Sequence, residues 1–271
     1  MARALFDPQR GYYTRNIKTV GARGDFSTSA TLSPELGKRI AAWLKGARNV
    51  IEIGAGNGQL MEQVQRSLGL LKRWRMRFHM VETSPVLREQ QQKRLRGVTW
   101  HETIESALAE TGGDAWIYHN ELLDAFPATL IEWRGGQWQE VWVPEELRPL
   151  EIDLASLTIR EWLQSGFTGW KRGQMLTIDY GDDFPALYHR RPGGTLRGYL
   201  MHQRLYWPEL LQSPGRMDLT ADINFTDYRA WCRELGWKEL SDQTLAEWAG
   251  IGDPEGAGGA FKCLIHQREA G

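Results

Sequence analysis

Residues 50–60 read VIEIGAGNGQL, and the interpretation of the whole chain starts from them. An apolar run that contains Glu52 is followed by Gly54, Gly56 and Gly58 at alternate positions, and apolar residues at helical spacing come next. This order predicts a buried strand, a tight turn and a helix. A nucleotide, a dinucleotide or a methyl donor would each fit a turn without side chains, and so would a turn that binds nothing.

Strand and helix patterns alternate around this turn. The predicted strands are residues 49–53, 75–82, 97–102 and 114–121, and the predicted helices are residues 59–70, 84–96 and 103–110. Alternation of this kind is typical of a parallel α/β sheet with right-handed crossovers. Ligands bind such sheets beyond the carboxyl ends of the strands, which is where the glycines lie.

The flanking parts of the chain add further elements without a linker or an internal repeat. A helix is predicted over residues 34–44 with Ser33 as its N-cap, and a β-hairpin over residues 128–143 around Gly135 and Gly136. Further predictions are strands at residues 174–182 and 260–267, a helix at 227–235, and an insertion at about 183–220. We therefore expect one domain over residues 1–271.

Composition excludes several classes of protein. The 271 residues carry 33 basic and 34 acidic side chains, so the net charge favours neither nucleic acid nor an anionic membrane. A local basic run, LKRWRMR at residues 71–77, is interpreted as a solvated helix end before a strand rather than a nucleic-acid patch. The start of the chain lacks an apolar signal core, so a cytoplasmic location is expected. Cys232 and Cys263 suggest neither a disulfide framework nor a zinc site.

The glycine spacing narrows the choice of ligand. A dinucleotide fold would need glycine at the sixth position of its motif, where Gln59 stands, and no G-K-[ST] follows as in a P-loop. The pattern E-x-G-x-G-x-G is instead found in S-adenosylmethionine-dependent methyltransferases, and the following helix offers N–H groups to a carboxylate. Glu82 ends the next strand, where a carboxylate can accept hydrogen bonds from ribose hydroxyls; otherwise it is an exposed strand-end acid.

Taken together, several motifs in chain order from Phe6 to Trp237 resemble the MidA-like methyltransferase family. The shared motifs are GDFSTS (24–29), SPELGKRI (33–40), IEIGAGNGQL (51–60), VETSPVLREQQ (81–91), HNELLDAFP (119–127), IDYG (178–181), GTLRGY (194–199) with His202, and DLTADINF (218–225). The chain departs from the family at Ala55, where many members have proline, and in a shorter middle section between Val143 and Met175.

The resemblance implies a fold, a cofactor and a substrate class. The fold is a class I methyltransferase, a Rossmann-like, mostly parallel seven-stranded sheet with helices on both faces, plus the hairpin and a small substrate-side insertion. The cofactor is S-adenosylmethionine, and Asp25, Phe26 and Thr28 would contact it from a lid-like N-terminal segment of about residues 1–32. The other expected cofactor-binding residues are Glu52, Gly54, Gly56, Gly58, Glu82 and Asn120. The family includes a mitochondrial complex I assembly factor that methylates an arginine, so a protein arginine is the expected acceptor.

Acceptor-side residues follow the strand at 114–121. Methyl transfer from a sulfonium mainly requires alignment and exclusion of water. Asn120, Glu121 and Asp124 lie near the expected position of the methyl group, and a helical turn would put Glu121 and Asp124 on one face. We hypothesise that Glu121, with Asp124, orients a guanidinium and accepts its proton. The alternative is that Asp124 caps a short helix and Glu121 is an ordinary strand-end residue.

The sequence gives little support for a metal site and leaves two alternative functions open. HETIE at residues 101–105 lacks the second histidine of a zincin motif, and the six histidines are scattered singly, so no metal is expected. Methylation of a small molecule, or a partner-binding assembly protein that keeps the cofactor fold without turnover, would fit the same motifs. The sequence carries no signal for the oligomeric state.

Overall fold

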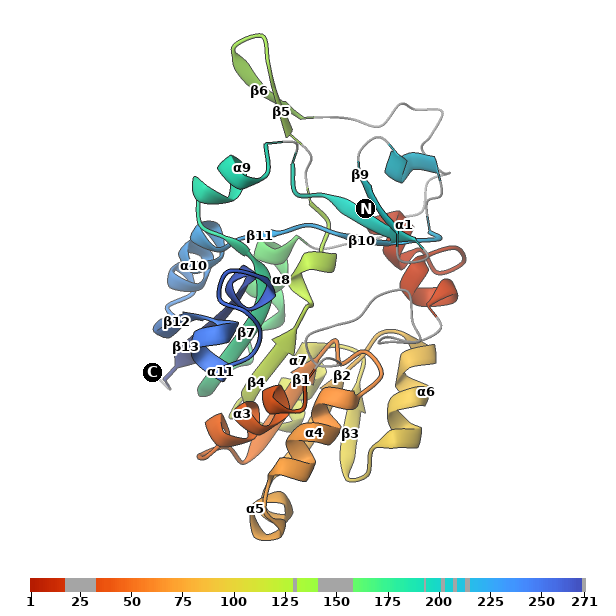
Figure 1. Ribbon diagram of the computed structural model, residues 1–271. Coiled ribbons are helices and arrows are strands. Elements are labelled where there is room, and N and C mark those ends of the chain that lie inside the picture. The colour runs from red at the N-terminus through yellow and green to blue at the C-terminus, as the bar shows by residue number, and fades with distance from the viewer. Residues whose placement is uncertain are drawn as a thin grey trace.

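The computed structural model describes residues 1–17, 33–128, 131–140, 158–192, 194–200, 203–206, 209–212 and 215–269. Its centre is a mostly parallel sheet between two layers of helices (Figure 1). The seven strands run in the order β12 (Lys238–Thr244), β13 (Phe261–Arg268), β7 (Gly173–Asp182), β4 (Trp116–Asn120), β1 (Asn49–Ile53), β2 (Arg77–Val81) and β3 (Val98–His101). The predicted class I sheet is confirmed, and a short strand, β11 (Ile223–Asn224), pairs with β7 beside it.

Strand direction fixes where a ligand can bind. β1, β2, β3, β4 and β7 are parallel, whereas β13 is antiparallel to both β7 and β12. The chain moves outward from β1 to β2 and β3, then returns to place β4 on the other side of β1. The order therefore reverses between β1 and β4, which is the point where open α/β sheets bind ligands.

Alternating burial along the strands explains the two helical layers. In β1, Val50 faces a core formed with α3 (Glu35–Trp43), α4 (Gln59–Ser67) and α11 (Leu245–Ala249). Ile51 and Ile53 face the opposite core with α7 (Ile104–Glu110), α8 (Ile159–Gly166) and α10 (Phe225–Glu234). Successive side chains of a strand point to opposite faces, so β1 is buried on both faces and its interior is apolar except at Glu52.

A second layer of structure stands over the carboxyl ends of the strands (Figure 1). The N-terminal elements α1 (Ala2–Phe6) and η1 (Tyr12–Asn16) pack through Leu5 and Tyr12 on Leu210 and Leu219. The strands there are β10 (Asp218–Thr220), β8 (Arg197–Leu200) and β9 (Gln203–Tyr206), an antiparallel sheet within the interval where the insertion was expected.

The remaining elements are short. The expected hairpin is confirmed as β5 (Ile131–Arg134) and β6 (Gln137–Glu140), joined by two glycines with positive φ. α6 (Pro85–Arg94) begins at Ser84, whose hydroxyl accepts a hydrogen bond from the Leu87 N–H. The other elements are η2 (Leu123–Ala125), α9 (Ala186–Arg190), η4 (Glu209–Gln212) and α12 (Ala257–Ala260).

One predicted helix is wrong in its extent. The helix expected over residues 59–70 ends at Ser67, and a separate helix, α5 (Leu70–Arg75), follows. Leu68 adopts an extended conformation and is buried in the core, and Gly69 is extended as well. Burial of the Leu68 side chain in this conformation outweighs the helical spacing of its neighbours.

The close approach of α3 and α4 depends on Gly37. A Cβ at this position would lie 2.4 Å from Cβ of Gln63 and 3.0 Å from its backbone carbon. We expect Gly37→Ala to lower the free energy of unfolding by about 1–2 kcal/mol, because overpacking outweighs the gain in helix propensity. Urea denaturation measures this change. The control is Gly69→Ala, where nothing lies within 4 Å; equal unfolding midpoints for the two variants would contradict the packing.

Candidate functional site

The glycine loop lies directly beyond the carboxyl end of β1. Gly54 (φ 66°) donates its N–H to the carbonyl of Val81 at 3.0 Å, and Gly58 (φ 79°) precedes the first residue of α4. A Cβ on Gly54 would lie 2.7 Å from Cδ1 of Leu122. Left-handed backbone and close packing both require glycine here. The amino end of α4 therefore lies at the carboxyl edge of the sheet, where the Gln59 N–H donates to Oδ1 of Asn57 at 3.1 Å.

Glu52 lies in β1, beneath this loop. Its side chain is 2% exposed, and Oε2 accepts a hydrogen bond from the Tyr118 hydroxyl of β4 at 3.0 Å. Burial raises the pKa of Glu52 to about 8, the Tyr118 hydrogen bond opposes this shift, and the charge of Glu82 adds to it. Glu52 therefore links β1 to β4 below the loop.

Glu82 follows the last residue of β2 and is 6% exposed. Oε1 accepts a hydrogen bond from the Ser84 N–H at 2.8 Å, and Oε2 accepts one from Nε2 of Gln91 at 3.0 Å. Burial raises the pKa of Glu82 to about 7, against the lowering effect of these two hydrogen bonds. Each carboxylate oxygen has two lone pairs, so the group can still accept bonds from two hydroxyls. Glu82 thus keeps acceptor capacity at the end of β2, and its role as a ribose ligand stays a prediction.

Gln91 joins the glycine loop to Glu82. This fully buried side chain of α6 donates from Nε2 to the carbonyl of Gly56 at 2.8 Å as well as to Glu82. Its Oε1 accepts the indole N–H of Trp100 at 3.0 Å. Sequence reasoning missed this residue although it ends the VETSPVLREQQ motif. A polar residue on the buried side of an otherwise polar helix gives no distinct signal in the periodicity.

The loop after β4 carries the acceptor-side candidates. Asn120 ends β4, and its Nδ2 lies 3.2 Å from Oε1 of Glu121. Glu121 has φ 52°, the only positive φ at a non-glycine residue in the described part of the chain. The Glu121 N–H donates to the carbonyl of Ile178 at 2.9 Å, which holds this backbone in place. A conformation that L residues rarely adopt persists only where the surroundings fix it.

The predicted shared face of Glu121 and Asp124 does not form. The short helix η2 starts at Leu123, so Glu121 precedes it in the left-handed conformation. Asp124 is buried, and its Oδ2 accepts the hydroxyls of Tyr180 and of Thr220, the latter at 2.7 Å. Asp124 thus fastens η2 to β7 and β10.

Asp179 anchors the same loop from β7. Its Oδ2 accepts the N–H groups of Leu122 at 3.2 Å and Leu123 at 2.9 Å. Burial raises the pKa of Asp179 well above its usual range, and the charges of Asp124 and Glu121 raise it further. Burial likewise raises the pKa of Asp124. Three carboxyl groups therefore gather at the carboxyl ends of β4 and β7.

The N-terminal segment joins this edge through Tyr13. Its hydroxyl donates to Oδ1 of Asp218 at 2.8 Å, and its carbonyl accepts the Ser84 hydroxyl at 2.8 Å. Arg197 stacks over the Tyr180 ring at 4.7 Å and forms an ion pair with Asp222. Motifs far apart in the sequence thus converge above the strands. Asp25, Phe26 and Thr28, as well as His202, lie outside the described residues.

Two histidines that are isolated in the sequence are neighbours in the fold. Nδ1 of His79 lies 3.1 Å from Nε2 of His101, which is 3.7 Å from Oε2 of Glu110. Burial lowers the pKa of both histidines. A neutral pair satisfies these facing nitrogens with one N–H···N hydrogen bond, and the strand pairing that creates it cannot be read from sequence spacing.

Comparison with known proteins agrees with this geometry. A sequence model of a protein family, described as putative S-adenosyl-L-methionine-dependent methyltransferase, matches residues 36–152 and 145–241. The chain is 27% identical over 279 residues to a protein named protein arginine methyltransferase NDUFAF7 homolog, mitochondrial, from Caenorhabditis elegans, covering 80% of this chain and 63% of that protein. The Danio rerio NDUFAF7 is 28% identical, with 84% of this chain and 66% of the relative covered. The chain thus spans slightly less than two thirds of these relatives.

A solved structure shares the fold. A likely methyl transferase from Burkholderia thailandensis, bound to S-adenosyl-homocysteine, superposes with a TM-score of 0.76 at 23% identity. The match covers 98% of this chain and 86% of that one.

The link between the glycine loop and Glu82 is testable by substitution. We expect Gln91→Leu to lower the free energy of unfolding by about 1–3 kcal/mol, because the carbonyl of Gly56 and the indole N–H of Trp100 lose buried partners. Urea denaturation gives the value, and the exposed neighbour Gln92→Leu is the matched control, with a change within about 0.5 kcal/mol. Equal stability of the two variants would refute the linking role.

Proposed function

The chain belongs to the family of putative S-adenosyl-L-methionine-dependent methyltransferases, and from this premise we propose that it transfers the cofactor's methyl group to an arginine of a protein substrate. The observation that carries the proposal is the glycine loop held against Glu82 by Gln91 at the switch point of the sheet. The names of the relatives support arginine as the acceptor. Complex I assembly and a cytoplasmic location stay predictions.

The residues at the switch point fit the cofactor. In this proposal the Glu82 carboxylate accepts hydrogen bonds from the ribose hydroxyls, and N–H groups in the first turn of α4 donate to the methionine carboxylate. Gly54 leaves no side chain between the loop and Leu122. Bound there, S-adenosylmethionine supplies an electrophilic methyl group on a sulfonium. The protein's task is then to align the acceptor and exclude water.

Glu121 is the residue best placed to orient the acceptor. Its left-handed backbone is fixed by the Ile178 carbonyl and by Asp179, which binds the two following N–H groups. Such conformations are found preferentially at functional sites. Its position after β4 also puts it beside the glycine loop, since β4 neighbours β1.

The charge around this loop favours a cationic acceptor. Burial raises the pKa of both Asp179 and Asp124, and the charges of Asp124 and Glu121 raise the pKa of Asp179 further. A guanidinium that approaches would stabilise their ionised forms and gain bidentate hydrogen bonds to Glu121. As the new N–C bond forms and the bond between the methyl group and the sulfonium sulfur breaks, Glu121 would accept the proton that the guanidinium releases.

Cofactor affinity should depend on the ionisation of Glu82. Without cofactor, burial raises the pKa of Glu82 to about 7. Hydrogen bonds from ribose hydroxyls would favour the charged carboxylate. Binding therefore releases a proton, so we expect affinity for S-adenosylmethionine to rise as the pH approaches 7 and to level off above it. Isothermal titration calorimetry in wild type and Glu82→Gln tests this, because titration of the ligand itself is common to both.

The Glu82→Gln variant should bind at least about tenfold more weakly at pH 8 and lose the component of pH dependence due to Glu82. Glu89→Gln, which changes an exposed acid on the neighbouring helix α6, should behave as wild type. Parallel pH profiles for wild type and Glu82→Gln would contradict the assignment, and absence of binding in wild type would leave only a non-catalytic role.

The acceptor hypothesis has its own test. Cell lysate proteins are incubated with tritiated S-adenosylmethionine, separated by size and analysed for methylarginine. We expect labelled protein bands, and about a hundredfold lower rate with Glu121→Gln at unchanged cofactor affinity, because the guanidinium loses its carboxylate partner. Glu255→Gln, an exposed substitution, is the control.

Three outcomes contradict parts of this proposal. Label only in small molecules would assign a different substrate class, and label in another amino acid would exclude arginine. A full rate with Glu121→Gln would remove Glu121 from the acceptor site.

A further inference from the structure

The helix α5 exposes three large apolar side chains at one end of the molecule. Leu70 is 87% exposed, Leu71 75% and Trp74 84%, and no residue of α5 is buried. Positions 70, 71 and 74 lie on one side of the helix. The other large apolar residues of the described chain are exposed to 62% or less. We call Leu70, Leu71 and Trp74 the α5 tip.

Cations flank the α5 tip on both sides. Lys72 and Arg75 are exposed, and the half-buried Arg73 donates to Oε1 of Gln65 at 3.4 Å. Within the described residues, none of these three side chains forms an ion pair with an acid. Arg77, the first residue of β2, is also exposed. Unpaired cations around an apolar centre leave a locally positive field although the whole chain carries a net charge of −1.

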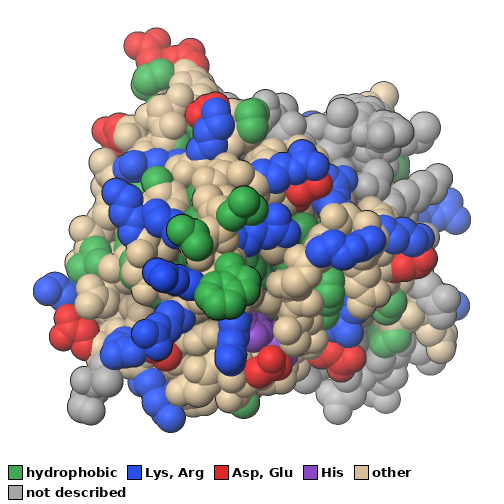
Figure 2. Space-filling model, turned by 90° about the horizontal axis from the view of Figure 1, so that it is seen from below, with side chains coloured by type: hydrophobic (Ala, Val, Ile, Leu, Met, Phe, Trp, Pro, Cys, Tyr) green, Lys and Arg blue, Asp and Glu red, His purple; other side chains and the backbone are tan. Residues whose placement is uncertain are grey.

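The topology extends this positive surface along the amino edge of the sheet. α5 leads into the amino end of β2, so it lies at the edge opposite the glycine loop (Figure 1). Arg48 precedes β1, Arg172 precedes β7, and Arg268 ends the antiparallel β13 opposite Gly173. Figure 2, which views this end of the molecule, shows hydrophobic side chains surrounded mainly by Lys and Arg.

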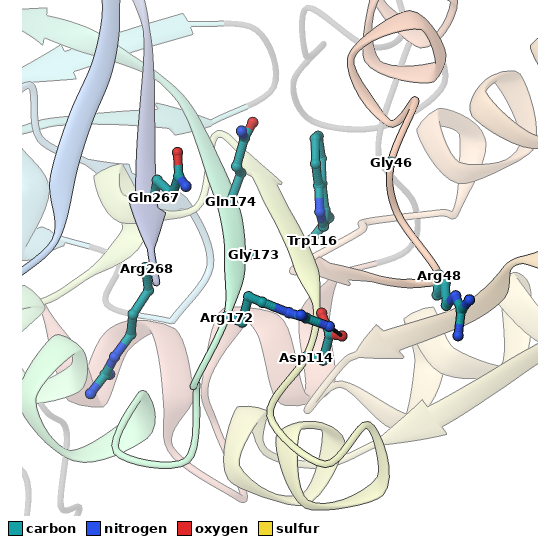
Figure 3. Close-up of a pocket in the computed structure, with 9 residues that line it drawn as sticks. All are labelled: Gly46, Arg48, Asp114, Trp116, Arg172, Gly173, Gln174, Gln267 and Arg268. Atoms are coloured by element: carbon teal, nitrogen blue, oxygen red, sulfur yellow. Dashed lines mark hydrogen bonds and ion pairs between the residues drawn. The ribbon is translucent and has the colours of Figure 1, made fainter. Parts of the chain in front are cut away.

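Two hollows on this side of the molecule are lined by further cations. A pocket of about 410 Å³ contains Arg48, Arg172 and Arg268, with Asp114 as the one acid in its lining, and Arg172 reaches across to Asp114 (Figure 3). A groove of about 700 Å³ between α3 and α4 reaches α5 and includes Lys45 and Lys72. The positive surface is therefore broad rather than a single site.

We propose that the α5 tip and its surrounding cations dock the protein on the surface of an anionic lipid membrane. The tip protrudes instead of forming a groove, so it suits a soft layer that its side chains can enter better than the flat surface of a protein. Cations spread over a whole face suit lipid headgroups, which can move laterally to each charge. Tryptophan and leucine with adjacent Lys and Arg are typical of helices that lie at a membrane interface.

Docking through the α5 tip would also orient the candidate site. With α5 on the membrane, the carboxyl ends of the strands and the glycine loop face away from it. No helix in the described ranges is long and apolar enough to cross a bilayer. The inference departs from the expectation drawn from net charge, because a total charge does not show how charges are distributed.

Vesicle co-sedimentation tests the proposal. Wild type is mixed with vesicles of phosphatidylcholine alone or of equal parts phosphatidylcholine and phosphatidylglycerol. We expect binding only to the anionic vesicles, weakened by added salt. Combined Leu70→Ala, Leu71→Ala and Trp74→Ala should lower the partition coefficient at least about tenfold, and so should combined Lys72→Glu, Arg73→Glu and Arg75→Glu.

Matched controls lie at the other edge of the molecule. Phe184→Ala removes an exposed apolar side chain just after β7, and Arg204→Glu reverses an exposed charge in β9. Both variants should bind vesicles like wild type. Circular dichroism and cofactor calorimetry establish that the α5 variants fold, which they should because α5 has no buried residue.

Absence of binding to anionic vesicles would overturn the proposal, as would equal binding by the α5 variants. A parallel binding experiment replaces the vesicles with soluble poly-glutamate, an acidic polymer without lipid. If wild type binds it as well as it binds vesicles, and the leucine and tryptophan substitutions cause no loss, the surface would be a site for an acidic protein and the membrane assignment would be wrong.

Discussion

The buried amide of Gln91 is the interaction on which the candidate site depends. One nitrogen holds the carbonyl of Gly56 and the carboxylate of Glu82 at 2.8 and 3.0 Å, so the glycine loop after β1 and the acid after β2 keep a fixed relation. Glu52 and Tyr118 then tie β1 to β4 underneath. The Glu82 carboxylate, the glycine loop and the Glu121 loop are thereby assembled on three neighbouring strands before any ligand arrives.

Local patterns predicted the parts of the fold that local forces determine. The β1 strand, its glycines and Glu82 at the end of β2 were found from apolar runs and turn residues, and each lies where the parallel sheet requires. β12 was not predicted from the residues, because its sequence KELSDQT is polar and largely exposed at the edge of the sheet. Its strand conformation comes from pairing with β13, a long-range effect.

In the candidate site, too, long-range contacts decide features that local spacing cannot predict. Spacing suggested a helix face shared by Glu121 and Asp124, but tertiary hydrogen bonds to Ile178 and Asp179 impose a left-handed residue first. Likewise, net charge gave no reason to expect a polarised surface. Only strand order brings Arg48, Arg172 and Arg268 to one edge and α5 beside them. The two edges therefore carry different chemistry, carboxyl groups beside the glycine loop and guanidinium groups at the opposite edge.

A crystal structure of the protein with S-adenosylhomocysteine tests the central claim most directly. The account predicts both ribose hydroxyls within hydrogen-bond distance of the Glu82 carboxylate, with Gln91 still bonded to Gly56, and the methionine portion over the glycine loop beside Glu121. A nucleoside bound away from β1 and β2, or a Glu82 side chain without contact to the ribose, would contradict it.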